Sequence, residues 1–178
     1  MLRPLPIVGA LAVQTTRRVD ARGWFVRAWS QAEPLGLPTA WAQVNQSGTA
    51  RAGTVRGLHW QAPPHAEAKL IWVVRGAIYD VIVDVRPGSA TWGQWHGERL
   101  AAGDGAQIYV PEGCAHGFQA LDDDTEVLYL STQPWCPEAE RGIRPDDPAI
   151  GVRWPLPLGE VSEKDRGWPD FAATQHRG

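Results

Sequence analysis

The sequence has few cysteines, almost no lysine and no long apolar run. Its two cysteines, Cys114 and Cys136, form neither a metal-type pair nor a disulfide framework, and they suit a reducing compartment. The longest apolar stretches have the length of a strand, far short of the roughly 20 residues that a membrane span needs. The N-terminus lacks a basic region followed by an apolar run, so no secretory signal is expected. We therefore predict a cytoplasmic protein that does not enter a membrane.

An excess of one charge is also missing, since the net charge is -3 and both signs are interspersed. A general nucleic-acid binder would show a basic face, so nucleic acid is not an expected partner. The 178 residues predict one domain over 1–178, which buries roughly 70% of its unfolded surface and needs no disulfides. Within it we expect a barrel over about 20–132 and a wrapping C-terminal segment over about 133–178.

Turn residues are abundant, with 15 prolines and 19 glycines. Short β-type runs recur between them, and this spacing predicts an all-β sandwich or barrel. Two brief peripheral helices are expected, at Ser30–Leu35 and around Glu138–Arg141. The predicted strands are Trp24–Trp29, Ala40–Ser47, Thr54–Trp60, Lys69–Arg75, Ala77–Val85, Gln94–Leu100, Gln107–Val110, His116–Leu121 and Thr125–Ser131.

Strand alternation assigns a titratable group to one face of several of these strands. His59 shares its face with Val55 and Gly57, because side chains alternate across a strand. Lys69 lies with Ile71 in the same way, and Tyr129, Asp80 and Asp84 each alternate with apolar residues. A polar outer face in water would give this pattern on any single strand. Its recurrence on four strands favours a barrel lumen lined for chemistry.

The stretch GAQIYVPEGCAH at 105–116 fits the second motif of the cupin superfamily. Pro111 and Gly113 provide a tight turn, and the following strand then points His116 inward. Many cupins hold a metal with a His-x-His pair, but His59 and His65 are six residues apart with two prolines between them. Metal ligands must converge at about 2.0–2.2 Å, so we predict a cupin β-barrel (a double-stranded β-helix, or jelly roll) without a metal or other cofactor.

Several segments together resemble the dTDP-4-dehydrorhamnose 3,5-epimerase family. The resemblance runs in order from about residue 5 to residue 165. Its segments are DARGWF at 20–25, QVNQS at 43–47, RGLHWQ at 56–61, AKLIWVVRGAIYDVIVDVR at 68–86, TWGQW at 91–95, PEGCAHGF at 111–118, VLYLST at 127–132 and SEKD at 162–165.

The resemblance implies a metal-free homodimer with exchanged N-terminal strands, acting on a dTDP-linked 4-keto-6-deoxy sugar in deoxysugar biosynthesis of the dTDP-rhamnose type. A base removes the acidic hydrogen next to the ketone, a cation stabilises the enolate, and an acid returns a proton on the opposite ring face. By resemblance, His59 is the base and Asp165 the carboxylate that orients it. Tyr129 is then the acid and Lys69 the cation beside the enolate oxygen, and the centres inverted are C3 and C5.

The resemblance also implies the residues that bind the substrate. Arg56 and Arg22 match the phosphate contacts, and Arg22 would reach the site from the partner subunit. Gln43 and Asn45 share a strand face and can bond ligand oxygens, and His116 would line the sugar pocket. The set of predicted substrate-binding residues is completed by Arg27, Trp135 and Glu140.

One conflict arises within this assignment. Arg56 and His59 have opposite parity on one strand, so both can face the lumen only if a β-bulge at Gly57 shifts the alternation.

The sequence departs from the family pattern at three positions. Arg27 stands where the family often has Glu, and Leu130 stands where it often has Lys, although parity turns residue 130 away from the lumen. Trp135 stands where a second tyrosine is common. Because an indole has no phenolic hydroxyl, this change leaves open whether C3, C5 or both are inverted.

Other interpretations stay open at this level. Asp80 or Asp84 is an alternative partner for the histidine. Alternative activities are a monofunctional C3- or C5-epimerase, a metal-dependent cupin oxygenase or isomerase, and a non-catalytic sugar-nucleotide binding module.

Overall fold

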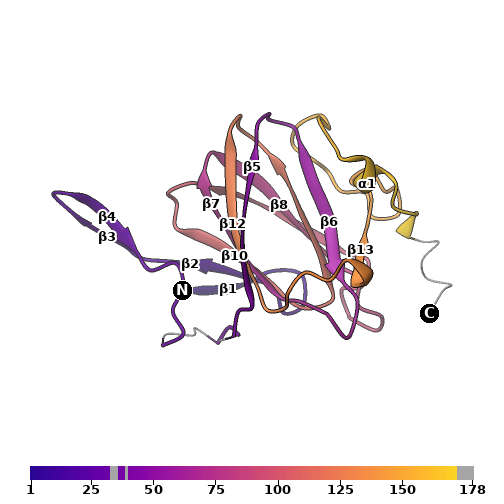
Figure 1. Ribbon diagram of the computed structural model, residues 1–178, viewed down its shortest axis with the longest axis horizontal. Coiled ribbons are helices and arrows are strands. Elements are labelled where there is room, and N and C mark those ends of the chain that lie inside the picture. Colours follow the sequence, from indigo (N-terminus) through magenta and orange to yellow (C-terminus); the bar gives the residue numbers. More distant parts are fainter. Residues whose placement is uncertain (33–35, 39, 172–178) are drawn as a thin grey trace.

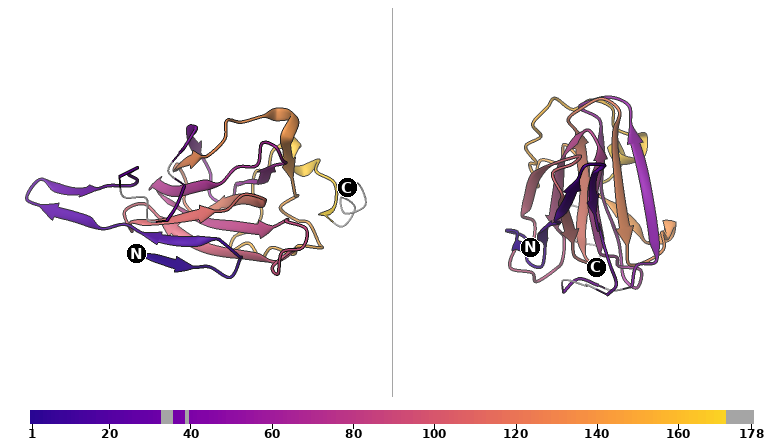
Figure 2. Two further views of the ribbon diagram at one scale, coloured as in Figure 1. Left: turned by 90° about the horizontal axis from the view of Figure 1, so that it is seen from below. Right: turned by 90° about the vertical axis from the view of Figure 1, so that its left-hand side faces the viewer.

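A computed structural model describes residues 1–178 except 33–35, 39 and 172–178. Two β-sheets face each other as the layers of a barrel, and a two-stranded hairpin stands clear of them (Figure 1). The view along the long axis shows the two layers of strands side by side (Figure 2). The architecture confirms the predicted all-β jelly roll.

The larger sheet has six strands in the order β1-β2-β10-β7-β12-β5, and all neighbouring pairs are antiparallel. Tyr129 lies near its edge, opposite Asn45 on one neighbour and Ile71 on the other. The strands are β1 (Leu2–Pro4), β2 (Leu11–Gln14), β10 (Ala106–Val110), β7 (Lys69–Arg75), β12 (Thr125–Ser131) and β5 (Gln43–Thr49).

The smaller sheet has five strands in the order β13-β6-β11-β8-β9, again antiparallel throughout. His59 pairs with His116 across two of these strands. The strands are β13 (Glu140–Gly142), β6 (Val55–Gln61), β11 (Cys114–Ala120), β8 (Ala77–Asp84) and β9 (Trp95–Ala101).

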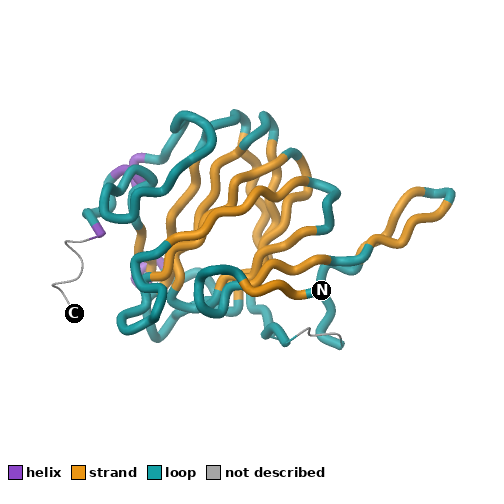
Figure 3. The backbone as a smooth tube through the Cα atoms, turned by 180° about the vertical axis from the view of Figure 1, so that it is seen from behind, coloured by secondary structure: helices purple, strands orange, loops and turns teal. Residues whose placement is uncertain are grey.

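The remaining strands, β3 (Arg17–Asp20) and β4 (Gly23–Val26), form the hairpin that projects from one end of the barrel (Figure 3). Its side chains Val19, Trp24 and Phe25 are exposed, although each is large and apolar. The hairpin therefore contributes little to the barrel's own core.

The barrel buries three apolar clusters. The main cluster lies between the sheets and includes Ile71 from β7, Ile82 from β8 and Phe118 from β11. A second cluster covers the outer face of the smaller sheet, where Ile143 and Ile150 of the C-terminal segment pack on its strands. The predicted wrapping of residues beyond 133 thus has a physical basis, because this segment removes an apolar sheet face from water.

A third cluster covers the outer face of the larger sheet and contains Leu70 and Leu130. Leu130 therefore points away from the lumen, as its parity predicts. Neighbouring side chains alternate accordingly, so Lys69 and Tyr129 turn toward the inside of the barrel.

All nine predicted strands occur, with ends that differ by a few residues at most. The sheet framework also contains β1, β2 and β13, so it extends beyond the predicted barrel of 20–132 on both sides. β1 and β2 are short strands that are defined by pairing rather than by local pattern, because β1 pairs with β2 and β2 pairs with β10.

Peripheral helices are shorter than predicted. Residues 30–32 are not helical, and the rest of the predicted helix at Ser30–Leu35 lies outside the described residues. Around Glu138–Arg141 a short 3-10 turn, η1 (Pro137–Ala139), leads into β13. One α-helical turn, α1 (Glu163–Arg166), was not predicted as a helix. Among the described residues, none of the helices has the length and apolar character that crossing a membrane requires.

Candidate active site

A cavity of about 550 Å³ is lined by residues of both sheets. Its walls come from β5 and β12 on one side and from β6 and β13 on the other, with Lys69 at the start of β7. A second cavity of about 420 Å³ adjoins it through His59 and runs toward α1. The first cavity is lined by Gln43, Asn45, His59, Trp60, Gln61, Glu67, Lys69, Tyr129, Trp135 and Glu140.

His59 on β6 forms a close pair with Asp165 on α1. The His59 Nε2 and Asp165 Oδ1 atoms are 2.5 Å apart, although the residues are 106 positions apart in sequence. The Asp165 side chain is 6% exposed, and it also accepts a 3.3 Å hydrogen bond from the Gly57 backbone N–H. Ser162 caps α1 by accepting from the Asp165 N–H, so the SEKD segment itself orients the carboxylate.

The charge of Asp165 determines which histidine nitrogen carries the proton. Burial pushes the pKa of the Asp165 carboxyl up, but the hydrogen bond and charge of His59 and the Gly57 N–H hold it below its usual range. An ionised carboxylate only accepts hydrogen bonds, so Nε2 of His59 must donate. This leaves the Nδ1 lone pair free to take a proton, and Nδ1 lies 3.9 Å from Glu140 Oε1 on the cavity wall.

A β-bulge places Arg56 and His59 on the same face. Arg56 pairs with Phe118, whereas His59 pairs with His116, so three steps along β6 match two steps along β11. Gly57 in the bulge has a φ of 108°, and a Cβ there would lie 2.7 Å from the His116 carbonyl oxygen. The conflict of parity in the sequence is thereby resolved as predicted, by a residue that must be glycine.

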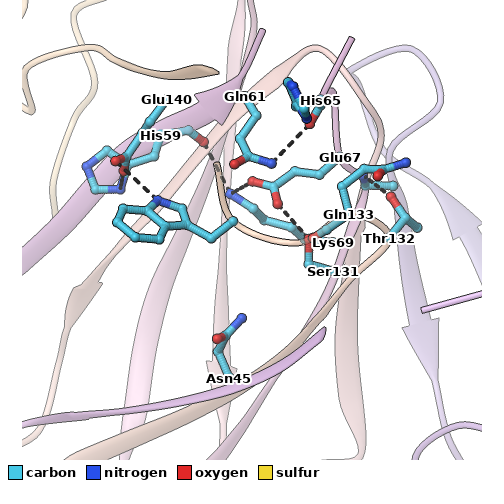
Figure 4. Close-up of polar contacts among 12 residues, drawn as sticks. Asn45, His59, Gln61, His65, Glu67, Lys69, Ser131, Thr132, Gln133 and Glu140 are labelled. Atoms are coloured by element: carbon cyan, nitrogen blue, oxygen red, sulfur yellow. Dashed lines mark hydrogen bonds and ion pairs between the residues drawn. The ribbon is translucent and has the colours of Figure 1, made fainter. Parts of the chain in front are cut away.

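Lys69 is held on the cavity wall by two oxygen partners. Its Nζ lies 3.0 Å from Glu67 Oε1 and donates a 3.4 Å hydrogen bond to the His59 carbonyl oxygen. The Glu67 Oε2 atom in turn accepts from Ser131 Oγ at 2.5 Å (Figure 4). The ammonium group is therefore anchored beside His59, within the same cavity.

Tyr129 lies on β12, in the sheet opposite His59, and lines the same cavity. Burial raises the pKa of its phenol, the charges of Glu67 and Glu140 raise it further, and Arg56 acts against them. Its hydroxyl therefore keeps its proton at neutral pH. The imidazole and the phenol are thus presented from opposite walls, as acid–base work on two faces of one ligand requires.

Trp135 and Glu140 form the rim of the cavity. The Trp135 indole N–H donates to Glu140 Oε2 at 3.3 Å, and Lys164 donates to Glu140 Oε1 at 2.8 Å. Burial raises the pKa of Glu140, but Lys164, His59 and Trp135 together lower it. The Trp135 backbone N–H bonds Gln43 Oε1, so the rim is tied to β5.

The other histidine candidate has a carboxylate of its own. His116 Nε2 lies 2.6 Å from Asp80 Oδ1, and both side chains are buried. Asp84 instead forms an ion pair with Arg86. Neither aspartate is therefore the partner of His59, whose carboxylate is Asp165. His116 is absent from the lining of the main cavity, and it lies beside His59 on the neighbouring strand β11.

Besides His116, two more predicted binding residues, Arg22 and Arg27, lie outside both cavities of this chain. Arg22 sits at the turn of the projecting hairpin, where it is exposed and paired with Asp20. Arg27 follows β4 and lines a separate depression beside β2. The expectation from the resemblance that Arg22 reaches a site from the partner subunit stays a prediction.

Three residues that line the two cavities and form hydrogen bonds there, Glu67, Gln61 and Lys164, were not predicted from the sequence. Glu67 and Lys69 are two residues apart, so parity could have placed them on one face. Gln61 shares the face of His59 by the same rule, and its Oε1 accepts from the Cys136 N–H. Lys164 belongs to the same SEKD segment as Asp165 and donates to Glu140, but the sequence predicted a role only for Asp165. In the described part of the chain, no group of three His, Cys, Asp or Glu side chains is arranged to hold a metal ion.

Comparison with known proteins identifies the family. The sequence family described as dTDP-4-dehydrorhamnose 3,5-epimerase matches residues 4–173. The chain belongs to this family. A relative from Pseudomonas aeruginosa with the same name is 45% identical over 159 residues, which cover 86% of each chain. Family membership confirms that the chain is an isomerase that epimerises a dTDP-linked sugar, as the resemblance predicts.

Two solved structures show the same fold in epimerases of modified sugars. NovW, a 4-keto-6-deoxy sugar epimerase from the novobiocin cluster of Streptomyces spheroides, matches with a TM-score of 0.93 at 38% identity and covers 100% of this chain and 90% of NovW. ChmJ, a 3'-monoepimerase from Streptomyces bikiniensis in complex with dTDP-quinovose, matches with a TM-score of 0.89 at 33% identity, over 98% and 90% of the two chains. Members of this fold therefore differ in the number of centres they invert.

Proposed function

We propose that this chain inverts C3 and C5 of dTDP-4-dehydro-6-deoxyglucose, with His59 as the base, Tyr129 as the acid and Lys69 as the oxyanion stabiliser. One observation carries the proposal. A carboxylate-paired imidazole and a partly buried phenol face one cavity from opposite sheets, and an ammonium group lines the same cavity. A sugar ring in this cavity would present one face to each group.

The first step is proton removal next to the ketone. His59 Nδ1 accepts the proton, and the resulting imidazolium is stabilised by the Asp165 carboxylate at Nε2. The electron pair of the broken C–H bond moves into the carbonyl, which becomes an enolate. The Lys69 ammonium stabilises the charge that develops on its oxygen.

The second step is proton return to the opposite face of the ring. The Tyr129 phenol lies on the wall opposite His59 and is protonated at neutral pH, so it can supply this proton. Each correctly placed acid or base contributes roughly 10²–10⁴ in rate. Because C3 and C5 both flank the C4 ketone, the same three groups serve both centres.

The nucleotide handle needs cations and hydrogen-bonding groups. Arg56 lines the cavity that adjoins His59 and provides a guanidinium for the pyrophosphate. Gln43 and Asn45 line the main cavity and can bond ligand oxygens, and Glu140 and Trp135 frame its rim. His116 supports His59 from the neighbouring strand.

We also propose a homodimer in which the hairpin of β3 and β4 reaches the partner. The hairpin exposes Trp24 and Phe25, and it carries Arg22 away from its own barrel. A second copy would cover these apolar side chains and receive Arg22 near its phosphate-binding region. The two free cysteines suit a cytoplasmic location.

The competing function is inversion of a single centre, as in ChmJ. Trp135 favours this alternative, because its exposed indole occupies the rim where the family commonly has a phenol. Solvent-deuterium incorporation distinguishes the two. In D₂O the bifunctional enzyme labels both C3 and C5 of the product, whereas label at one carbon alone contradicts the proposal.

The role of His59 has its own test. We expect His59→Ala to abolish deuterium exchange while binding of dTDP persists, because the imidazole contributes to chemistry and not to the nucleotide handle. Retained exchange would eliminate His59 as the base.

A further inference from the structure

Glu67 is a cavity carboxylate for which the proposed mechanism has no use. It lies on the loop before β7, and its side chain is 10% exposed. Each of its oxygens has a partner: Oε1 lies 3.0 Å from Lys69 Nζ, and Oε2 accepts from Ser131 Oγ at 2.5 Å (Figure 4). Burying a carboxylate is costly, so this arrangement requires that both partners be retained.

Lys69 needs this kind of support. A lysine side chain has four rotatable carbons and carries its charge at the end, so its ammonium has no preferred position of its own. Besides Glu67, the only hydrogen-bond partner of its Nζ among the described residues is the His59 carbonyl oxygen, at 3.4 Å. The carboxylate is therefore the stronger of the two anchors.

Ser131 fixes the carboxylate in turn. It lies on β12 two residues beyond Tyr129, and it pairs with Lys69 across the neighbouring strands. Its hydroxyl contacts both Glu67 Oε2 and the Gln133 carbonyl oxygen, at 2.5 and 2.9 Å. The three side chains thus form a chain of contacts from the strand that carries Tyr129 to the ammonium beside His59.

We propose that Glu67 is a positioning residue of the reaction, which holds the Lys69 ammonium on the cavity wall and is itself held by Ser131. This inference rests on the proposed role of Lys69 as the oxyanion stabiliser. It adds a second effect of the same carboxylate, because Glu67 places a negative charge near the Tyr129 phenol.

That second effect has a definite sign. Burial raises the pKa of Tyr129 most, Glu67 and Glu140 raise it further, and Arg56 lowers it. Lys69 from β7 and His59 from β6 also line the cavity that Tyr129 faces. Glu67 therefore helps to keep the acid protonated, and its loss must move the alkaline limb of the pH profile to lower pH.

The test compares two variants that separate charge from position. Glu67→Gln removes the charge and keeps the shape, so we expect kcat to fall about tenfold or more through a misplaced Lys69. The KM should change by less than about twofold, because Glu67 does not contact the nucleotide handle. We also expect the alkaline limb of kcat, measured between pH 7 and 11, to move to lower pH.

Ser131→Ala leaves the carboxylate charge in place and removes only its anchor. We expect a smaller loss of kcat and an alkaline limb that stays at the wild-type pH. The matched control is Glu98→Gln. Glu98 lies on β9, at the far edge of the smaller sheet, and its carboxylate pairs with Arg3 at 2.7 Å. This control should keep both the wild-type kcat and the wild-type limb.

The proposal is overturned if Glu67→Gln retains the wild-type kcat. If Glu67→Gln does not fold, the proposal is overturned by a wild-type kcat in Ser131→Ala. It is equally overturned if Glu67→Gln lowers kcat while its alkaline limb stays in place and KM rises instead. A failure of the proposed function has a different signature, because His59→Ala would then retain deuterium exchange.

Discussion

Replacing Asp165 by Asn tests the central pair of the site. The change keeps the size of the side chain and one oxygen, but it removes the negative charge 2.5 Å from His59 Nε2. It also offers an amide N–H where the imidazole needs an acceptor. Burial pushes the pKa of the Asp165 carboxyl up, but His59 and Gly57 hold it below its usual range, so the wild-type group is ionised near neutral pH.

The size of the effect follows from the geometry of the pair. Asp165 is 6% exposed and His59 is 26% exposed, so an effective dielectric constant of about 20 is appropriate. With charge centres about 4 Å apart, the carboxylate then stabilises the imidazolium by about 4 kcal/mol. Since about 1.4 kcal/mol corresponds to a factor of ten in rate, proton abstraction should slow by about 10³.

The assay is deuterium incorporation at C3 and C5 of the sugar, followed by NMR in D₂O with Asp165→Asn. The control is Asp84→Asn, which removes a buried carboxylate that pairs with Arg86 and not with histidine. We expect the control to keep the wild-type exchange rate per folded molecule, although it should lower stability by about 3 kcal/mol. Exchange within tenfold of wild type in Asp165→Asn would refute the assignment of the pair.

Three further predictions follow from the same geometry. Tyr129→Phe should reduce product formation by roughly 10²–10⁴, while solvent deuterium still enters the recovered substrate through His59; loss of both, measured by NMR, would contradict the division between acid and base. Trp135→Phe removes the indole donor to Glu140 and should change the ratio of label at C5 and C3 by about twofold or more, with dTDP affinity unchanged by calorimetry; an identical ratio would exclude the rim from centre selection. Burial raises the pKa of the Asp84 carboxyl, but Arg86 and nearby hydroxyls lower it below its ordinary value of about 4. The ionised carboxylate therefore stabilises the folded protein above pH of about 4, and this contribution is lost as the pH falls below that value. In urea titrations, the free energy of unfolding should fall less steeply toward acid pH in Asp84→Asn than in wild type.

Local pattern was sufficient to predict most of the fold. The nine predicted strands exist because alternation and turn residues act over a few positions, and β7 and β12 have the predicted ends. β1, β2, β3 and β13 were not predicted because three or four residues carry too little pattern. They are defined by their pairing: β1 with β2, β2 with β10, β3 with β4 and β13 with β6. The expected helix near 138 became a 3-10 turn because β13 begins at Glu140 and pairs with β6.

The site divides in the same way. Strand parity alone predicts that Lys69 and Tyr129 point inward and that Leu130 points outward, because the side chains of a strand alternate regardless of the rest of the fold. Parity also demanded a bulge at Gly57 if Arg56 and His59 were to share a face, and the register of β6 against β11 contains it.

What the sequence by itself determined was the all-β class, the family, and the residue types available for acid–base chemistry. Only the tertiary structure decided which carboxylate serves which histidine. Asp165 reaches His59 across 106 residues and Asp80 reaches His116 across 36, and no local pattern distinguishes these pairs. The Asp165–His59 pair depends on how the C-terminal segment packs on the smaller sheet, whereas the Asp80–His116 pair depends on the register of β8 against β11. That packing is a long-range consequence of burying apolar surface.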